Sequence, residues 1–385
     1  MTRPRTVTWE QICARRLERH GLATPVPATQ LADVVGVICG AHAQVMSAAE
    51  VSVAIRVTGI ARDDVRRALW EERSIVKTIG PRGTVHLLRA ADLPTWNAGL
   101  GAAMAPPNAA PDVRLSDDQL EAVIEAIDGA LTESDRTLEE LDAEVVRRAG
   151  PWAGDRVMPA FQQLWPRWRQ AIQRAAYRGV LCFGPNQGNR VTYASPRRWL
   201  PGYEPADPAE AGIAVLRAYL HAYGPAAAEH VARWTNGTPA WTRDVFRRAA
   251  DELESVELDG ERLWQLAGDE APENGARGVV RLLPYFDAYA VGSHPRARLF
   301  PGRAGGRALA STQAGNYPVL LVGDAVVGVW HQKRSGKRIA LRVEAFRDLT
   351  AAERGAVEQQ AERIADIQGA TATLEYGEIT VGPHA

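Results

Sequence analysis

His42 and Gln44 are the residues of this sequence best suited to moving a proton and holding a water molecule. They stand two positions apart in the segment Ala41-His42-Ala43-Gln44. Histidine can accept a proton near neutral pH, and a glutamine side chain both donates and accepts hydrogen bonds. Residues two apart share one side of an extended chain, so both side chains can point into one cleft. A histidine beside a small residue is more often structural, and the rest of the chain must decide between the two roles.

The residues around this pair predict a short connection between two helices. Apolar residues recur at positions 31, 34, 35 and 38, the spacing of an amphipathic helix. The segment from Ser47 to Glu50 has the Ser-x-x-Glu pattern of a capping box, which predicts that a second helix opens there. We therefore expect His42 and Gln44 in or beside the connection.

Length and composition indicate an ordinary globular protein of several domains. A chain of 385 residues is too long for one core, so two to four domains are expected. There is no apolar run long enough for a transmembrane helix and no secretory signal, so we expect a cytoplasmic protein without membrane contact. Three scattered cysteines predict a reducing compartment, no disulfide framework and no metal site.

The basic residues are unusual in kind and in place. Lysine occurs only at positions 77, 333 and 337, and arginine supplies the rest of the 45 basic residues, as expected from a GC-rich genome. The net charge of −1 does not by itself indicate a nucleic-acid partner, but it leaves room for a local basic track. Four cations, Lys333, Arg334, Lys337 and Arg338, surround a predicted hairpin turn, where they can grip phosphates or remain solvated. Arg82, in an earlier turn, is a second candidate phosphate ligand.

The order of elements predicts winged helix-turn-helix units. Helices are expected near 8–19, 29–39, 48–57 and 62–72, with Arg15, Arg16 and Arg19 on the outer side of the first. Strands at 74–79 and 84–88 then flank a Gly-Pro-Arg-Gly turn, which is a hairpin signal. The pattern returns with helices near 116–131, 138–149 and 167–178 before strands at 180–183 and 190–193. A third pass has helices near 208–222, 225–234 and 241–252 before strands at 255–258 and 261–266, joined by Asp-Gly.

From about residue 278 the sequence becomes rich in β-forming residues. Strands are expected at 279–283, 318–322, 325–331 and 338–343, then a helix near 350–367 and a last strand near 371–381. We therefore predict an α+β fold of three tandem winged helix-turn-helix units and a β-rich, barrel-like C-terminal domain. The predicted domains are 1–104, which holds the catalytic stretch, 105–204, 205–272 and 273–385. Winged helices bind DNA through a helix and a wing, although many bind proteins instead.

Four segments, in order over nearly the whole chain, resemble the winged-helix DNA glycosylases of the AlkZ/YcaQ type. His42-Ala43-Gln44 stands at the family's Gln-apolar-Gln motif. Residues 68–74 leading into 82–87 resemble its first wing, and Leu283 to Tyr289 resembles its Pro-x-x-Asp-Glu-Tyr-like stretch. Residues 318–330 resemble its C-terminal hairpin. Two departures stand out: His42 replaces the first glutamine, and Ala288 follows Asp287 where the family has glutamate.

The resemblance implies tandem winged helices around a concave DNA-binding face. It implies hydrolysis of the N-glycosidic bond of alkylated purines in double-stranded DNA, including interstrand crosslinks and bulky natural-product adducts, with no metal or organic cofactor. An N7- or N3-alkylated purine is cationic and leaves as a neutral base, so the enzyme must mainly place a water at C1′ and stabilise an oxocarbenium-like sugar. Gln44 would orient that water, and His42 would orient it or accept its proton.

Two other functions remain open at this point. A non-catalytic winged-helix regulator or architectural protein could use the same surface, and a protein-interaction scaffold is a third possibility, which the basic turn disfavours. The sequence has no heptad pattern or apolar stripe for a dimer, so we expect a monomer, associated with the nucleoid. The small residues Gly40, Ala41 and Ala43 line the catalytic stretch, which contains no aromatic residue, and this predicts an open face that accepts bulky adducts.

Overall fold

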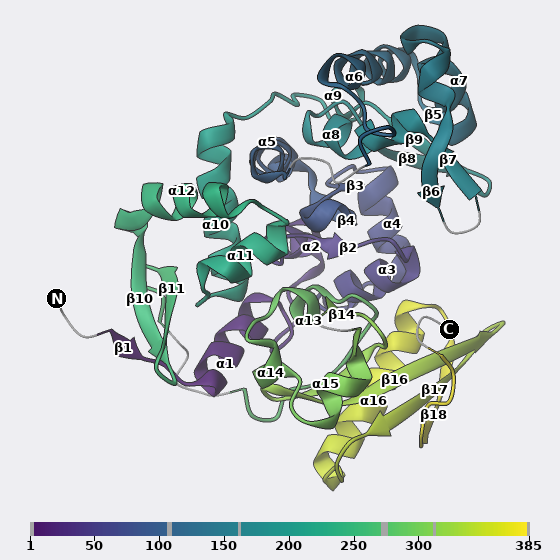
Figure 1. Cartoon of the computed structure of the whole chain (residues 1–385). Helices are drawn as coiled ribbons and strands as arrows, with labels where there is room; N and C mark the ends of the chain where they lie inside the picture. The colour runs from purple at the N-terminus through teal and green to yellow at the C-terminus, as the bar shows by residue number, and fades with distance from the viewer. Residues whose placement is uncertain (1–3, 106–109, 161–162, 271–275, 311–312, 383–385) are drawn as a thin grey trace. The chain divides into compact units, whose positions relative to one another are not determined.

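The computed structural model describes residues 4–105, 110–160, 163–270, 276–310 and 313–382 (Figure 1). The chain divides into two compact units. Unit 1 comprises residues 1–68, 216–231 and 246–385, and unit 2 comprises residues 69–215 and 232–245. The α+β class is confirmed, and within the described ranges no helix is both long and apolar enough to cross a membrane.

The N-terminal part of unit 1 places the predicted catalytic segment between two helices. Helix α2 (Leu31–Val37) leads into the two-residue strand β2 (Ala41–His42), and α3 (Met46–Ala54) follows. The predicted capping box is wrong: α3 begins at Met46 without a side-chain cap, so Ser47 lies inside the helix. Glu50 is buried and binds Arg66 of α4 (Arg62–Trp70) at 2.6 Å, so its carboxylate serves a tertiary ion pair.

Helix α1 (Trp9–Arg19) opens with a true capping box, formed by Thr8 and Gln11, but two of its arginines are buried. The expectation that Arg15, Arg16 and Arg19 all lie outside is therefore wrong for the first two. Arg16 donates to the carbonyl oxygens of residues 224 and 225, and Arg15 donates to Gln265 in β11 (Glu261–Leu266). Burial lowers the pKa of Arg15 to about 10, which still leaves it charged at neutral pH.

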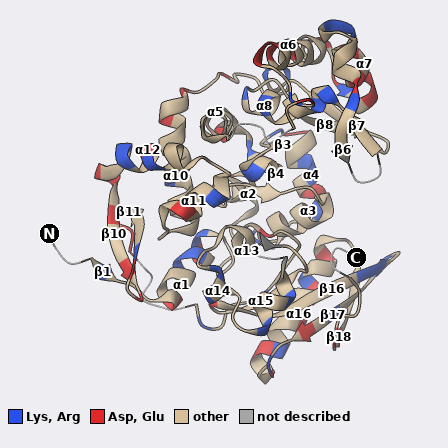
Figure 2. Cartoon of the chain, viewed as in Figure 1, with Lys and Arg blue, Asp and Glu red and all other residues tan. Residues whose placement is uncertain are grey.

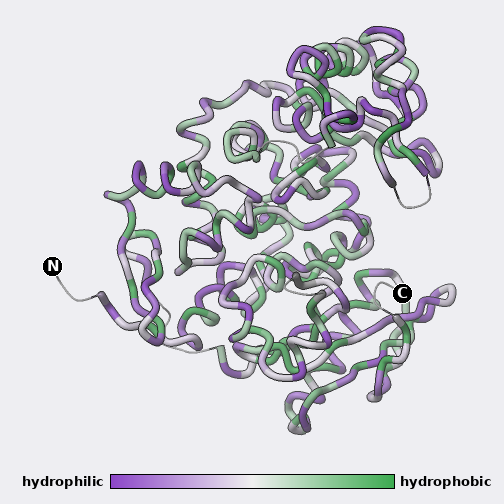
Figure 3. Tube along the Cα trace, in the orientation of Figure 1, coloured by the Kyte–Doolittle hydropathy of each residue, from purple (hydrophilic) through white to green (hydrophobic). Residues whose placement is uncertain are grey.

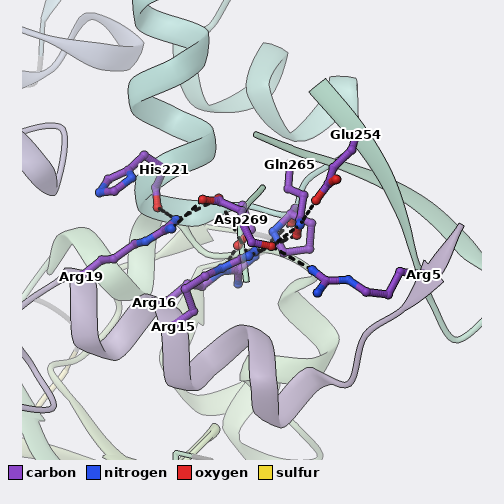
Figure 4. Close-up of polar contacts among 10 residues, drawn as sticks. Arg5, Arg15, Arg16, Arg19, His221, Glu254, Gln265 and Asp269 are labelled. Atoms are coloured by element: carbon purple, nitrogen blue, oxygen red, sulfur yellow. Dashed lines mark hydrogen bonds and ion pairs between the residues drawn. The ribbon is translucent and has the colours of Figure 1, made fainter. Parts of the chain in front are cut away.

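Asp269 is the carboxylate that pairs with Arg15 and Arg19 (Figure 4). Its Oδ1 accepts from Arg19 at 2.8 Å, and its backbone carbonyl accepts from Arg5. Arg5 belongs to β1 (Arg5–Thr6), which pairs in parallel with β10 (Leu253–Leu258), while β10 pairs with β11 as the predicted hairpin. The cluster thus ties α1 to the third hairpin within unit 1.

The C-terminal part of unit 1 is a five-stranded, half-barrel sheet in the order β12-β15-β16-β17-β18. Its strands are β12 (Val280–Leu283), β15 (Val319–Val322), β16 (Ala325–Ser335), β17 (Arg338–Ala345) and β18 (Thr371–Tyr376). Helix α16 (Ala351–Ile367) starts at a capping box of Thr350 and Glu353 and connects β17 to β18, which run parallel. The predicted β-rich character is confirmed, but the last strand ends at Tyr376, because Ile379 turns back to Glu344.

Three short helices, α13 (Ala288–Gly292), α14 (Arg296–Leu299) and α15 (Arg303–Ala308), lie between β12 and β15 along the chain, followed by the strand pair β13–β14 (Leu309–Ala310 and Gln313–Ala314). The sequence did not predict these elements. Helices α10 (Pro208–Tyr223), α11 (Ala228–Thr235) and α12 (Pro239–Arg248) have residues in both units.

Unit 2 contains the other two predicted hairpins. Strands β3 (Ile75–Ile79) and β4 (Val85–Arg89) pair across the Gly80–Gly83 turn, and β8 (Cys182–Gln187) pairs with β9 (Arg190–Ala194). Helices α6 (Asp117–Glu133) and α7 (Leu138–Ala149) both start at capping boxes, and β5 (Arg136–Thr137) joins β9. The unit also holds the hairpin β6–β7 (Arg156–Ala160 and Gln163–Pro166), α8 (Ile172–Tyr177) and α9 (Pro196–Trp199).

All three predicted wing-like hairpins therefore form. Their grouping into three winged-helix units, and the domain limits at 104, 204 and 272, stay predictions. The three cysteines are buried and free, as expected without a disulfide framework.

Helix α5 (Leu93–Ala103) was not predicted, because Pro94, Gly99 and Gly101 all disfavour a helix in sequence. Gly99 has a packing reason. A Cβ atom at this position would lie 2.7 Å from Val215 Cγ2 and 2.9 Å from the carbonyl oxygen of Ala211, both on α10. Because glycine has no Cβ atom, α5 and α10 can approach each other closely at Gly99.

We expect Gly99→Ala to destabilise unit 2 by about 1–3 kcal/mol, because the added methyl group overpacks the contact with α10. The measurement is the free energy of unfolding from urea titration. Gly101→Ala is the matched control in the same helix, since the nearest atom to its Cβ would be at 3.6 Å, and replacing a helical glycine there gains up to about 1 kcal/mol. Equal effects of the two substitutions would contradict this account.

Candidate active site

His42 and Gln44 lie where the sequence placed them, in the extended connection between α2 and α3. Cys39 and Gly40 adopt left-handed φ angles of 59° and 95°, which turn the chain from α2 into β2. His42 is buried, with 6% of its surface exposed, whereas Gln44 is exposed, and Ala43 between them is buried. The pair thus joins an anchored imidazole to an amide in contact with solvent.

The ring of Phe286 packs against His42, with ring centroids 4.6 Å apart and planes inclined by 35°. Phe286 has a φ of 54°, in the left-handed region that bulky side chains rarely adopt. Gly315 lies directly against this ring, since a Cβ atom there would overlap the phenyl carbons. Packing on both sides therefore holds Phe286 in a strained conformation against the imidazole.

A buried ion pair between Arg56 and Asp287 holds the turn that carries Phe286. Arg56 follows α3, and its guanidinium donates to both carboxylate oxygens of Asp287 at 2.7 and 2.8 Å. The Ser52 hydroxyl donates to the same carboxylate at 2.7 Å, and the backbone N–H of Tyr289 donates at 3.0 Å. Both charged side chains are fully inaccessible to solvent.

The charge state of Asp287 follows from these contacts. Burial alone raises the pKa of the Asp287 carboxyl, but the positive charge of Arg56 and the hydrogen bonds from Arg56, Ser52 and Tyr289 outweigh it. The net result is a pKa below the ordinary value, so Asp287 is ionised at neutral pH. Asp287 is also the N-cap of α13, which favours a negative charge at that helix end. Its geometry is that of a positioning residue.

Aromatic residues surround this ion pair. His20 packs edge-on against Tyr223 and Tyr289, with ring centroids 5.1 and 5.4 Å away. Burial lowers the pKa of His20 to about 3, so this imidazole is neutral at neutral pH. The Tyr223 hydroxyl donates to the carbonyl oxygen of Ile38, one residue beyond α2, at 2.8 Å. The contacts fix the end of α2, from which the chain enters the segment that carries His42 and Gln44.

A cavity of about 240 Å³ lies beside the predicted catalytic pair, entirely within unit 1. Val45 and the start of α3 contribute four residues to its wall, and the turn after β12 contributes Tyr285 and Phe286; the four are Val45, Ser47, Ala48 and Val51. The remaining wall comes from Trp330, His331 and Gln332 of β16 and from two prolines, Pro284 and Pro318. Phe286 thus contacts His42 and also forms part of the cavity, and Val45 directly follows Gln44.

Two polar side chains of this wall, Trp330 and Gln332, hydrogen-bond within the protein. Trp330 Nε1 donates to the carbonyl oxygen of Leu283 at 2.9 Å. The amides of Gln332 and Gln368 hydrogen-bond each other, with Gln368 Nε2 2.9 Å from Gln332 Oε1. Burial lowers the pKa of His331, which keeps it neutral at pH 7. The cavity is therefore mainly aromatic and aliphatic.

The four predicted phosphate ligands lie at the tip of the β16–β17 hairpin, which forms as expected. Lys333, Arg334, Lys337 and Arg338 are all exposed, and Figures 2 and 3 show this end of the hairpin as basic and hydrophilic. Arg334 donates to the carbonyl oxygens of Gly336 and Gln368. Among the described residues the other three cations have no ion pair, so their charges face solvent. The cavity residue Gln332 directly precedes Lys333 on the same strand.

Arg82, the remaining predicted DNA ligand, lies in unit 2. It has a left-handed φ of 59° in the turn between β3 and β4 and is half-buried. The turn packs on α8, because the Tyr177 hydroxyl donates to the carbonyl oxygen of Gly80 at 2.8 Å and Gln173 lies against Gly83. This wing is held by its own unit, and the role of Arg82 stays a prediction.

Sequence reasoning missed the aromatic cavity. The predicted open face was inferred from small residues near His42 in sequence, whereas Phe286 reaches His42 from a distant segment. The one available signal was the density of aromatic residues in Pro284-Tyr285-Phe286-Asp287-Ala288-Tyr289. Trp330 and His331 gave no signal, because β16 reads as an ordinary strand.

A family model, a curated protein and a solved structure each match this chain over most of its length. Residues 35–367 match the family model described as DNA glycosylase AlkZ-like. The chain is 32% identical, over 351 residues, to a Streptomyces sahachiroi protein named interstrand DNA cross-link repair glycosylase, covering 84% of this chain and 87% of that protein. The solved structure of Streptomyces sahachiroi DNA glycosylase AlkZ is similar with a TM-score of 0.79 and 27% identity, over 97% of this chain and all of the other.

We expect Asp287→Asn to destabilise the protein by about 3–5 kcal/mol at neutral pH, because it leaves the buried Arg56 without its counter-ion. Since the pKa of Asp287 is lowered on folding, its contribution is complete above the unfolded carboxyl pKa of about 3.9 and is lost as pH falls through the lower folded value. The difference between wild type and variant should therefore shrink only in strong acid. Thermal unfolding at a series of pH values measures it.

The exposed pair of Arg342 and Glu375 provides the control for this experiment. Its atoms are 2.8 Å apart, but both side chains are about half exposed or more, so Glu375→Gln should cost less than about 1 kcal/mol. A loss of similar size in both variants would show that burial does not strengthen the Asp287 interaction.

Proposed function

The chain belongs to the AlkZ-like family of DNA glycosylases, and we propose that it hydrolyses the N-glycosidic bond of cationic N7- and N3-alkylpurines in double-stranded DNA. The observation that carries the proposal is the placement of His42 and Gln44 beside an aromatic cavity, with a basic hairpin rising from the same wall. All of these features belong to unit 1.

In the proposed reaction the leaving base does not need to be protonated by the enzyme. Alkylation at N7 or N3 makes the purine cationic, so it departs as a neutral base, while positive charge develops on the sugar. Gln44, which is exposed, orients the attacking water through its side-chain oxygen. His42, held by Phe286, orients the same water or takes its proton. Uncharged lesions such as uracil need acid assistance, so we expect them to be inert.

We propose further that bulky adducts and interstrand crosslinks are substrates. The relative from Streptomyces sahachiroi is named as a cross-link repair glycosylase, and the candidate site of this chain has an exposed residue at its catalytic pair. We also propose that the protein acts as a monomer on chromosomal DNA in the cytoplasm. The competing function is that of a non-catalytic DNA-binding protein. The two are distinguished by the reaction product, because only a glycosylase leaves an abasic site in the DNA.

We expect His42→Ala and Gln44→Ala each to slow single-turnover excision of N7-methylguanine by about 10²–10⁴-fold, since each removes a group that handles the attacking water. The double variant should lose less than the product of the two effects, because the residues act as a unit. Alkali cleavage of the abasic product in a labelled duplex measures the rate.

Gln30→Ala is the control for loss of a glutamine. Gln30 is exposed in unit 1 and makes no cap hydrogen bond to α2. Full activity of the double variant would exclude this pair as the catalytic site. No abasic product from the wild-type protein on any alkylated duplex would refute the proposed function as a whole.

We expect neutralisation of the basic hairpin to reduce the salt dependence of DNA binding. Each lost phosphate contact changes the slope of log K against log salt by roughly 0.9 on duplex DNA. Glutamine replacements of Lys333, Lys337 and Arg338 should therefore lower the slope by up to about 2.7. Arg334 should contribute less, since its guanidinium already donates to two carbonyl oxygens.

Arg342→Gln on β17 is the matched control, because that arginine is paired with Glu375. Binding isotherms at several salt concentrations provide the slopes. If the slope of the triple variant equals that of the wild type, the hairpin does not contact phosphates.

A further inference from the structure

We propose that the cavity formed by α3, the Pro284–Phe286 turn and β16 binds the apolar substituent of a bulky purine adduct rather than the purine itself. This inference rests on the proposed function and assigns it a specificity site. The cavity holds about 240 Å³, which is below the usual range of roughly 300–1,000 Å³ for a whole ligand and suits one planar ring system.

The position of the cavity connects it to the reaction. The ring of Phe286 packs against His42, and Phe286 also forms part of the cavity wall. Val45 follows Gln44 and is 42% exposed, which makes it one of the few large apolar side chains in the described ranges that solvent reaches. An adduct whose C1′ lies at His42 and Gln44 therefore has an apolar lip and an aromatic hollow next to its alkyl group.

The chemistry of the wall favours the substituent over the base. Enzymes that extrude a base read its edge with hydrogen-bond donors and acceptors. Here Trp330 Nε1 is bonded to Leu283, and the amide of Gln332 is bonded to that of Gln368. Ser47 and His331 add polar groups to the wall, but its apolar surface is larger than its polar surface. The side chains of Tyr285, Phe286 and Val51 supply apolar and aromatic contacts, which select by shape and stacking.

Two substitutions probe the cavity in different ways. Ala48→Leu fills it, because Ala48 is a buried part of the wall. Val45→Ser removes the apolar lip and places a favourable N-cap residue before α3, so the fold is retained even if the buried substitution disturbs it. Val191→Ser is the control, since Val191 is a similarly exposed valine, at 37%, on β9 of unit 2.

The experiment measures single-turnover excision from duplexes that carry either N7-methylguanine or N7-(naphthylmethyl)guanine. The readout is the ratio of the naphthylmethyl rate to the methyl rate. We expect Ala48→Leu and Val45→Ser each to lower this ratio by about tenfold or more, the scale on which an apolar pocket discriminates groups. Val191→Ser should leave the ratio at the wild-type value.

The outcomes separate this inference from the proposed function. An unchanged ratio in both cavity variants overturns the inference while leaving the glycosylase activity in place. An equal loss on both substrates also overturns it, because the cavity would then receive the base common to both. Absence of excision by the wild-type protein overturns the proposed function and this inference together.

Discussion

The buried ion pair between Arg56 and Asp287 is the constraint on which the candidate site depends. It joins two segments 231 positions apart in the chain, the end of α3 and the turn before α13. Removing two charges from water is costly, and the cost is offset by close geometry and by further hydrogen bonds, which Ser52 and the Tyr289 N–H donate to the carboxylate here. The result is a junction with one acceptable geometry. Phe286, the residue before Asp287, is thereby held against His42 in a backbone conformation it would otherwise avoid.

Local signals in the sequence predicted much of the fold. Gly-Pro-Arg-Gly, Asp-Gly and Ser-Gly turns between β-forming runs located three hairpins correctly, because such turns are specified by adjacent residues. Ser47-x-x-Glu50 has the same local pattern as a genuine capping box and failed, since Arg66 on another helix binds Glu50. Arg16 likewise fits the outer face of a helix by pattern but donates to carbonyl groups more than 200 positions away.

In the candidate site too, features set by neighbouring residues could be predicted, and contacts between distant segments could not. His42 and Gln44 could be singled out because their types and spacing are visible in four letters, and the cations of the hairpin because they cluster around one turn. The cavity could not be predicted, since its wall combines α3 with a turn and a strand from the C-terminal sheet. Strand β16 carries both cavity residues and cations, and at about 3.3 Å per residue His331 lies roughly 13 Å from the turn. That length is comparable to the width of the DNA major groove, about 12 Å.

Unit 1 is built from segments that are far apart in the chain, so the ribosome synthesises its parts at different times. Its candidate catalytic pair lies within the first 68 residues, yet the turn and strand that complete the candidate site lie beyond residue 246. During synthesis His42 and Gln44 therefore emerge from the ribosome long before the Pro284–Phe286 turn and β16. The edge of β17 that pairs with β18 stays unpaired until β18 has also emerged. A chain that ends before residue 284 contains His42 and Gln44 but lacks the Pro284–Phe286 turn, β16 and the basic hairpin. The candidate site is therefore complete only after the C-terminal sheet has been synthesised.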